Sequence, residues 1–301
     1  VVSVDAAGLA TVTDGYTLAP AAPRRAPVRL LLTSDHQLKP MTPANLEIAA
    51  QTFGVELDGV LMAGDFVNTP DRASEWFDSD TGLGFFASFT GRATRTIAGR
   101  TYRGAPILQH TPLFPAIGNH EVMGRWSATD ALTSQFNNPQ PTAVAERLWQ
   151  QTQPTGVDHD AWVTDHSWNV DTYAQMFPFP RSAEGGPRWY ARTIGDVYLV
   201  SLFVTAIWRP AAATGKGKFQ EPAEALGDPN GWGYGQFVFE PVSRGSRQYD
   251  WLERQLRSAE ARAARYRVVM YHHPAHGLGD NSAPAYTDPV QAVTIDPVTG
   301  G

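Results

Sequence analysis

The tetrapeptide Gly118 to Glu121, Gly-Asn-His-Glu, combines residue types that suit metal-assisted chemistry. It follows a short apolar run, 113–117, which is typical of a buried strand. The side-chain oxygen of Asn119 can ligate a metal ion, and the adjacent imidazole of His120 can then reach a phosphate bound to that metal. Gly118 allows the backbone to turn sharply into such a site. Because any four-residue motif can arise by chance, this interpretation depends on companions at other strand ends.

Three further apolar runs end in residues that can bind a metal. The runs and the residues that follow them are 28–33 with Asp35, 59–63 with Gly64–Asp65, and 266–271 with His272–His273. In open α/β sheets, ligands bind beyond the carboxyl ends of the strands, so we expect these side chains to meet there. Carboxylate, amide oxygen and imidazole are ligands that Mn, Fe or Zn accept, and a bridging carboxylate can hold two ions together.

The order of these motifs resembles that of the calcineurin-like metallophosphoesterase superfamily, over roughly Arg29 to Gly277. The stretch 248–252 also looks like the helix before the His motif in purple-acid-phosphatase-like members. The resemblance implies an α+β fold, a four-layer α/β/β/α sandwich that holds two divalent or trivalent metal ions, Mn, Fe or Zn. It further implies hydrolysis of a small-molecule phosphoester by a hydroxide that bridges the two ions.

The resemblance also implies roles for individual residues. Asp65 is expected to bridge the two ions and thereby to serve catalysis directly. Asp35 is expected to bind one ion, and Asn119 and His272 the other. His120 is expected to assist the departing group without ligating a metal, and general acid help of this kind contributes roughly 10²–10⁴-fold.

Four further residues are candidates for supporting roles. Glu121 can orient His120 or a metal ligand, because ligands need such support. Arg125 can bind a phosphate through its bidentate fork, with Trp126 beside a base or aryl group. The alternatives are an exposed arginine and a packed tryptophan. His273 either faces the substrate or packs against its surroundings.

Two positions depart from the pattern of the family that this sequence resembles. The family pattern Asp-x-His becomes Asp35-His36-Gln37 here. Residues 35 and 37 of an extended backbone share a face, so Gln37 is expected at the ligand position; a local twist that presents His36 is the alternative. Purple acid phosphatases carry Tyr where this chain has Asn68, so an iron-loaded protein is expected to be colourless.

The end of the sequence departs further from the family, which closes its site with Gly-His-x-His. No histidine follows His276, and 292–301 is typical of a strand that enters a turn. We therefore expect a fragment, with a catalytic domain over 27–301 that lacks its C-terminal part. The segment 1–26 is strand-like and ends in a Pro/Ala-rich linker, as a remnant of a preceding β domain or a frayed tail would.

Composition narrows the remaining possibilities. The 301 residues suffice for one large domain, and a net charge of −6 gives no global field that attracts nucleic acid. The absence of cysteine excludes disulfides and thiolate chemistry. No run approaches the ~18 apolar residues of a membrane helix. Many Trp and few Lys favour a secreted or periplasmic protein, with a cytoplasmic one as the alternative, and no particular oligomeric state is indicated.

The elements that must position these residues follow from local patterns. Thr42 is expected to cap a helix that has Pro43 at its first position and ends at Gly54, with an inner face of Leu46, Ala49, Ala50 and Phe53. A helical stretch with a glycine interruption is expected over 71–89. Gly195–Asp196 predicts a hairpin, and Ser246 begins a helix with apolar positions at Tyr249, Leu252 and Leu256.

Gln37 and the missing Gly-His-x-His keep a second function open, a non-catalytic phosphate-binding or scaffold domain with a degenerate metal site.

Overall fold

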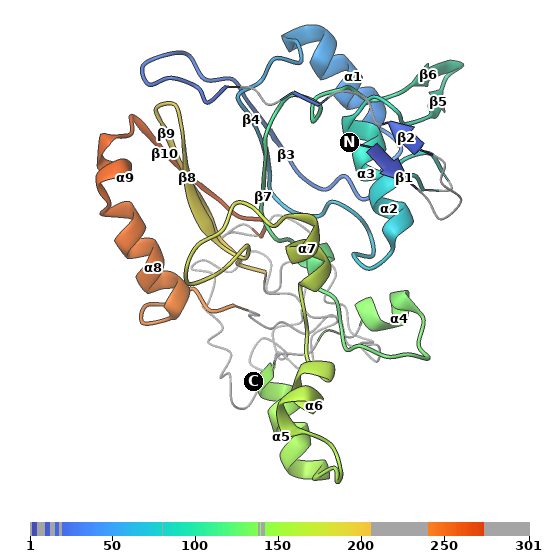
Figure 1. Cartoon of the computed structure of the whole chain (residues 1–301), viewed down its shortest axis with the longest axis vertical. Coiled ribbons are helices and arrows are strands. Elements are labelled where there is room, and N and C mark those ends of the chain that lie inside the picture. Colours follow the sequence, from blue (N-terminus) through green and yellow to red (C-terminus); the bar gives the residue numbers. More distant parts are fainter. Residues whose placement is uncertain are drawn as a thin grey trace, which may run out of the picture.

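Two three-stranded β-sheets, two two-stranded sheets and the helices around them make up the described part of the computed structural model (Figure 1). The residues that it describes are 2–4, 10–12, 16–17, 20–79, 81–137, 139, 142–205 and 240–273. The expected α+β class is confirmed. The expected C-terminal strand over 292–301 lies outside the described residues.

The first sheet supplies three of the four predicted strand ends. Its strands are β3 (Leu30–Thr33), β4 (Gly59–Met62) and β7 (Leu113–Pro115), in the order β3-β4-β7. Both pairings are parallel, with Leu31 opposite Val60 and Leu61 opposite Phe114. Because parallel strands end at the same edge, the loops after them emerge side by side.

The second sheet supplies the fourth strand end. Its strands are β8 (Tyr190–Ile194), β9 (Val197–Ser201) and β10 (Tyr266–Met270), in the order β10-β9-β8. Strands β8 and β9 form the antiparallel hairpin expected around Gly195, where φ is +56°. Strand β10 runs parallel to β9, so it delivers His272 at the end of the sheet where β9 also ends.

One face of each sheet contributes to a shared apolar cluster. Its buried members are Leu61, Ala116, Ile194, Leu199 and Met270. The side-chain hydroxyls of two further residues, Tyr190 (2.7 Å) and Ser201 (3.3 Å), donate to the carbonyl oxygen of Pro115 at the end of β7. These contacts bind the second sheet to the chain just before the Gly-Asn-His-Glu turn.

Helices cover the other faces of both sheets. On the first sheet, Val60 and Met62 belong to the same buried cluster as Leu46 of α1 (Thr42–Phe53). On the second sheet, Val200 belongs to that cluster together with Trp251 of α8 (Arg247–Leu256). Figure 1 shows α8 and α9 (Ala259–Ala263) beside β8–β10, and α1 to α3 on the side of β3, β4 and β7.

The predicted cap at Thr42 and two predicted core positions are wrong. Met41 is the N-cap of α1 and Thr42 is its first helical residue, so this helix begins one residue earlier than expected. Gly54 caps its end, and Ser246 caps α8 by accepting the N–H of Tyr249 at 3.2 Å, both as predicted. Phe53 is 75 % exposed and Leu256 is 37 % exposed, since the last turn of each helix contributes nothing buried. The buried face of α8 instead includes Gln248, whose amide bonds the backbone N–H and C=O of Phe203 at 2.8 and 2.9 Å.

The remaining elements are short. Glycine does interrupt the stretch 71–89, which forms α2 (Ala73–Phe77) and α3 (Phe85–Phe89) around Gly82 and Gly84. The others are β1 (Val2–Val4), β2 (Ala10–Val12), β5 (Arg95–Ile97), β6 (Arg100–Tyr102), the 3-10 turn η1 (Asn119–Glu121), α4 (Leu132–Phe136), α5 (Thr142–Thr152), α6 (His159–Asp165) and α7 (Asp171–Met176).

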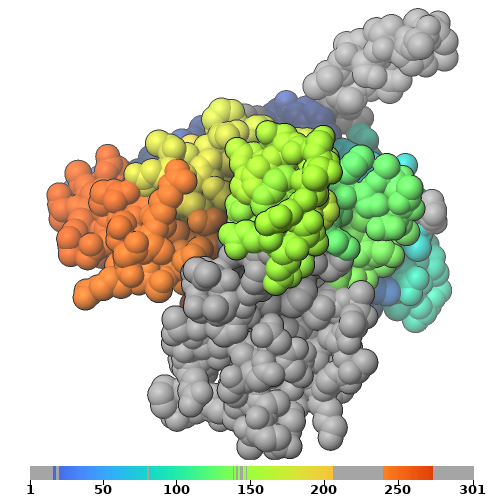
Figure 2. Space-filling view, turned by 90° about the horizontal axis from the view of Figure 1, so that it is seen from below, coloured from blue at the N-terminus to red at the C-terminus, as the bar shows by residue number. Residues whose placement is uncertain are grey.

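Helices α5 and α6 pack on each other, with the ring centroids of Trp149 and Trp162 5.4 Å apart. In Figure 2, α5 and α6 lie between the orange α8–α9 pair and the green segment that carries α4. Strands β1 and β2 pair antiparallel, which agrees with the strand-like reading of the first residues, and the division at residue 26 stays a prediction. Within the described residues, no helix has the length and apolar character needed to cross a membrane.

Candidate metal centre

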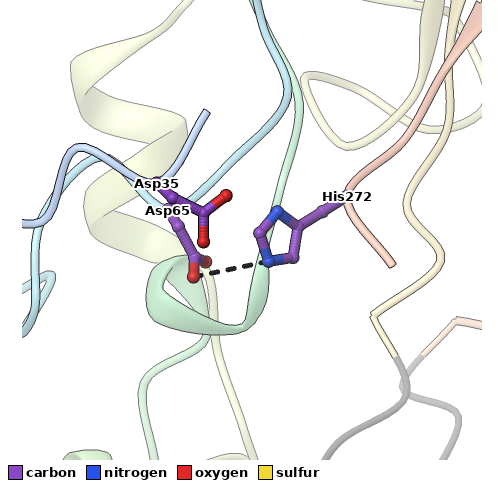
Figure 3. A group of neighbouring side chains, drawn as sticks. All are labelled: Asp35, Asp65 and His272. Atoms are coloured by element: carbon purple, nitrogen blue, oxygen red, sulfur yellow. Dashed lines mark ion pairs between the residues drawn. The ribbon is translucent and has the colours of Figure 1, made fainter. Parts of the chain in front are cut away.

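Three of the predicted metal ligands meet in space. One ligand atom from each of Asp35, Asp65 and His272 lies within 4.8 Å of the others. They follow β3, β4 and β10, so the group draws on both sheets (Figure 3). Two carboxylates and an imidazole form a donor set that suits Mn, Fe or Zn.

Asp65 is the centre of this group. Its Oδ2 lies 3.3 Å from Nε2 of His272 and 4.0 Å from Nε2 of His120, and it accepts a hydrogen bond from Nε2 of Gln37 at 2.9 Å. Its Oδ1 accepts the backbone N–H of His120 at 3.0 Å. Asp65 is only 3 % exposed, so nearly all of its surroundings are protein groups that converge on one carboxylate.

The charges of Asp65 and His272 depend on each other. Burial lowers the pKa of His272, but the hydrogen bond and the negative charge of Asp65 outweigh burial and raise that pKa to about 9. Burial likewise raises the pKa of Asp65, but the hydrogen bond and charge of His272 bring it down to about 2. Without a metal, the pair is therefore a carboxylate beside an imidazolium, and a cation can take the place of the imidazolium proton.

The ring of His272 is oriented as metal-binding imidazoles are. Its Nδ1 lies 2.7 Å from the carbonyl oxygen of Ala63, which can only accept, so Nδ1 carries a proton and Nε2 faces Asp65. A hydrogen bond from the nitrogen that does not bind the metal fixes the ring and raises the basicity of the nitrogen that does. His273 packs edge-on against His272, with ring centroids 4.7 Å apart, and its contact with substrate stays a prediction.

The backbone at the group is strained. Asp35, Gln37, Leu38 and Asp65 have φ of +58°, +35°, +56° and +59°, in the left-handed region. Such conformations each cost about 1–3 kcal/mol and cluster at functional sites. Backbone hydrogen bonds hold the first loop against the second, from Asp35 N–H to Gly64 O at 3.2 Å and from Gln37 N–H to Phe66 O at 3.0 Å.

Two glycines let the loops after β4 and β7 touch. A Cβ on Gly64, where φ is +90°, would lie 2.6 Å from the backbone nitrogen of Gly118. A Cβ on Gly118 would lie 2.3 Å from Oδ1 of Asp65. Both distances are shorter than real contacts allow, so any side chain here displaces the loops that carry Asp65 and His120.

Glu121 fixes the same two loops through hydrogen bonds to their backbone. Its carboxylate accepts the backbone N–H groups of Asp65 (2.8 Å), Phe66 (2.8 Å) and Gly118 (2.7 Å), and it is 1 % exposed. Burial raises the pKa of Glu121 to about 8, and the charge of Asp65 acts in the same direction, while the three N–H donors lower it. Of the two roles expected for Glu121, its contacts match the support of a ligand, Asp65.

Gln37 and His36 lie on opposite sides of the first loop. Gln37 contacts Asp65, whereas His36 is buried edge-on against Phe89, with ring centroids 4.8 Å apart. The Nε2 atom of His36 lies 2.9 Å from the Thr33 hydroxyl, and burial lowers its pKa to about 4. The loop is not the extended backbone from which Gln37 is predicted as the ligand. It nevertheless turns residue 37 towards Asp65.

His120 and Asn119 occupy η1. The Nδ1 atom of His120 lies 2.7 Å from the carbonyl oxygen of Asn68, and its ring stacks on Phe136 with centroids 4.9 Å apart. Asn119 is 7 % exposed, and its Nδ2 has no hydrogen-bond partner among the described residues. A buried N–H donor without an acceptor is unusual, and it fits a site that gains an acceptor such as a phosphate oxygen. The metal contact of Asn119 stays a prediction.

Arg125 lies in a separate pocket. This pocket of about 240 Å³ is lined by Trp126, Gln135 and His166 among others, and it shares no lining residue with the Asp35–Asp65–His272 group. Trp126 is 66 % exposed, so the alternative of a packed tryptophan is wrong. Phosphate binding by Arg125 stays a prediction.

Sequence reasoning missed two neighbours of His120, namely Asn68 and Phe136. Each contacts the histidine from a separate segment of the chain, the loop before α2 or helix α4, and no local pattern marks such contacts. Comparisons of the sequence with protein-family models and with curated proteins found no match.

Proposed function

We propose that this protein is a metal-dependent phosphoester hydrolase of the calcineurin-like metallophosphoesterase type. The observation that carries the proposal is the convergence of Asp35, Asp65 and His272 with His120 at strand ends from two sheets. We also propose the four-layer α/β/β/α arrangement, supported by an apolar cluster shared between the sheets and helices on their other faces.

In this proposal, Asp35, Asp65 and His272 hold the metal, and the neutral oxygens of Gln37 and Asn119 complete a centre for two ions, Mn, Fe or Zn. Gln37 presents Nε2 to Asp65 in the metal-free state, and a half-turn of its amide brings Oε1 to the same position. Such ions would supply positive charge that neutralises the phosphate oxygens, and they would lower the pKa of the water that attacks phosphorus.

His120 supplies the acid. Since Nδ1 donates its proton to the carbonyl of Asn68, Nε2 is the nitrogen that faces the centre. A protonated His120 then gives the Nε2 proton to the departing oxygen and keeps the Nδ1 proton in its hydrogen bond. Asp65 accepts the backbone N–H of the same residue, which ties the acid to the metal ligand.

One observation favours a second function, a phosphate-binding or scaffold domain without turnover. Gln37 stands where the family has an imidazole, and an amide is a weaker ligand for Zn or Fe. A small-molecule phosphoester substrate and a secreted or periplasmic location stay predictions.

The test uses metal content and turnover together. The purified chain is equilibrated with Mn, Fe or Zn, its bound metal is counted, and a panel of phosphomonoesters and phosphodiesters is assayed. Asp65→Asn is expected to abolish turnover and lower metal content with the fold retained. Asp58→Asn is the matched control, because Asp58 lies at the amino end of β4, where its carboxylate accepts the N–H of Arg29 at 2.7 Å. Full turnover in Asp65→Asn would refute the proposal.

A further inference from the structure

His120 is held from two sides. The carbonyl oxygen of Asn68 accepts its Nδ1 proton at 2.7 Å, and the ring of Phe136 stacks on it at 4.9 Å with an angle of 28° between the planes. Asn68 lies in the loop before α2 and Phe136 lies at the end of α4, so the two supports come from separate segments. Their relative position therefore sets both the tautomer and the tilt of the imidazole.

Glu75 fixes the first support. Its Oε2 accepts the backbone N–H groups of Asn68 at 2.7 Å and Thr69 at 3.1 Å. Glu75 is 3 % exposed, so its carboxylate is directed inward rather than solvated. The Asn68 carbonyl shares a peptide unit with the Thr69 N–H. Because this N–H and the Asn68 N–H both donate to Glu75, the peptide unit cannot rotate freely, and the direction of the Asn68 carbonyl is fixed.

Arg72 connects the two supports. Its Nη1 donates to Oε1 of Glu75 at 3.0 Å, and its Nη2 donates to the hydroxyl of Thr133 at 3.2 Å. Thr133 lies in α4, three residues before Phe136. One guanidinium thus binds the residue that sets the Asn68 carbonyl and the helix that sets the stacking ring.

We propose that Arg72 is a positioning residue for His120. The inference rests on the proposed function, because it assigns Arg72 to the alignment of the acid. Most surface Arg–Glu pairs contribute little, but this one joins a half-exposed arginine, at 46 %, to a carboxylate that is 4 % exposed. Lysine cannot replace Arg72, since an ammonium lacks the rigid fork that bonds Glu75 and Thr133 at once.

The first experiment separates alignment of the acid from general damage. Arg72→Lys and Thr133→Val are assayed on an alkyl phosphate, whose departing oxygen needs a proton, and on 4-nitrophenyl phosphate, whose departing group is stable as an anion. Because misplacement of a catalytic group by 1 Å can cost 10²-fold, turnover of the alkyl ester by Arg72→Lys is expected to fall about tenfold or more. Turnover of the nitrophenyl ester should change far less. Thr133→Val should also lose more turnover on the alkyl ester than on the nitrophenyl ester, by a smaller margin.

Arg100→Lys is the matched control. Arg100 donates to Glu47 at 2.8 Å on the surface between β6 and α1, and it touches neither support of His120. It should leave both substrates unaffected. An equal decrease for both esters in Arg72→Lys, or no decrease beyond that of the control, would overturn the proposal.

The second experiment is independent of turnover. Imidazole ¹⁵N NMR of the metal-free chain, with the His120 signals assigned by comparison with His120→Gln, reports which ring nitrogen carries the proton. The native chain should show the Nδ1–H form, and Arg72→Lys should show a mixture of both tautomers. An unchanged tautomer in Arg72→Lys and in Thr133→Val would refute the role of Arg72, even if the native chain hydrolyses no ester and the proposed function fails.

Discussion

Replacement of Gly118 by alanine tests the site geometry most directly. Gly118 has φ of −101°, which any residue adopts, so the added methyl acts only through its contacts. It would lie 2.3 Å from Oδ1 and 2.9 Å from the backbone nitrogen of Asp65. Oδ1 must therefore move by about 0.7 Å to restore even 3.0 Å, and overpacking of this kind costs about 1–3 kcal/mol.

The displaced group is the one on which the proposed metal binding depends. Asp65 cannot move without loss of its contacts to the His120 N–H and to His272. We therefore expect Gly118→Ala to lose most of its metal affinity while it remains folded. The assay is calorimetric titration with Mn or Zn, alongside thermal unfolding of the same samples.

Gly99→Ala is the control for stability. Gly99 has φ of +81° and open space around its Cα, so alanine there adds only backbone strain of about 1–2 kcal/mol. The two variants should lose similar stability, but only Gly118→Ala should lose metal. Native metal affinity in Gly118→Ala, or equal losses of affinity in both, would refute the arrangement of Asp65 against the β7 loop.

Three further predictions address other parts of the molecule. Glu121→Gln cannot accept all three N–H groups, so metal affinity should fall about 10–100-fold, as for other residues that orient ligands, and calorimetry that shows native affinity would contradict this. The pKa of His159 is raised from 6.5 by its hydrogen bonds to Asp160 and Glu146, so its contribution to stability is complete below 6.5 and is lost as pH rises through the raised pKa. The difference in unfolding free energy between the native chain and His159→Gln should therefore shrink in alkaline buffer. The iron-loaded protein should be colourless, because Asn68 replaces the tyrosinate, and a visible charge-transfer band would contradict this.

Local patterns predicted those parts of the fold that depend on local chemistry. Gly54, Gly195 and Ser246 each act within a few residues of themselves, and the helix end, hairpin and helix start that they predicted are present. Phe53 and Leu256 were assigned to the core because periodicity identifies a helix face, but it does not say how far along the helix the neighbouring layer extends.

The candidate site was predictable to the extent that its residues follow strands. Asp35, Asp65 and His272 lie directly beyond apolar runs, and the rule for strand ends brings them together. Gln37 was assigned by alternation along an extended chain, but positive φ at Asp35, Gln37 and Leu38 decides its direction. The roles of Asn68, Phe136 and Thr133 depend on contacts between separate segments of the chain, which no periodicity encodes.

The buried charge of Asp65 links the stability of this molecule to its proposed function. A carboxylate that is 3 % exposed requires a positive partner, and His272 supplies one when no metal is present. The three N–H groups accepted by Glu121 and the close approach of Gly64 to Gly118 hold the Asp65 loop in place whichever cation is there. The chain can therefore keep its strained loops arranged without a metal, which is why loss of metal and loss of fold should be separable in the variants at this site.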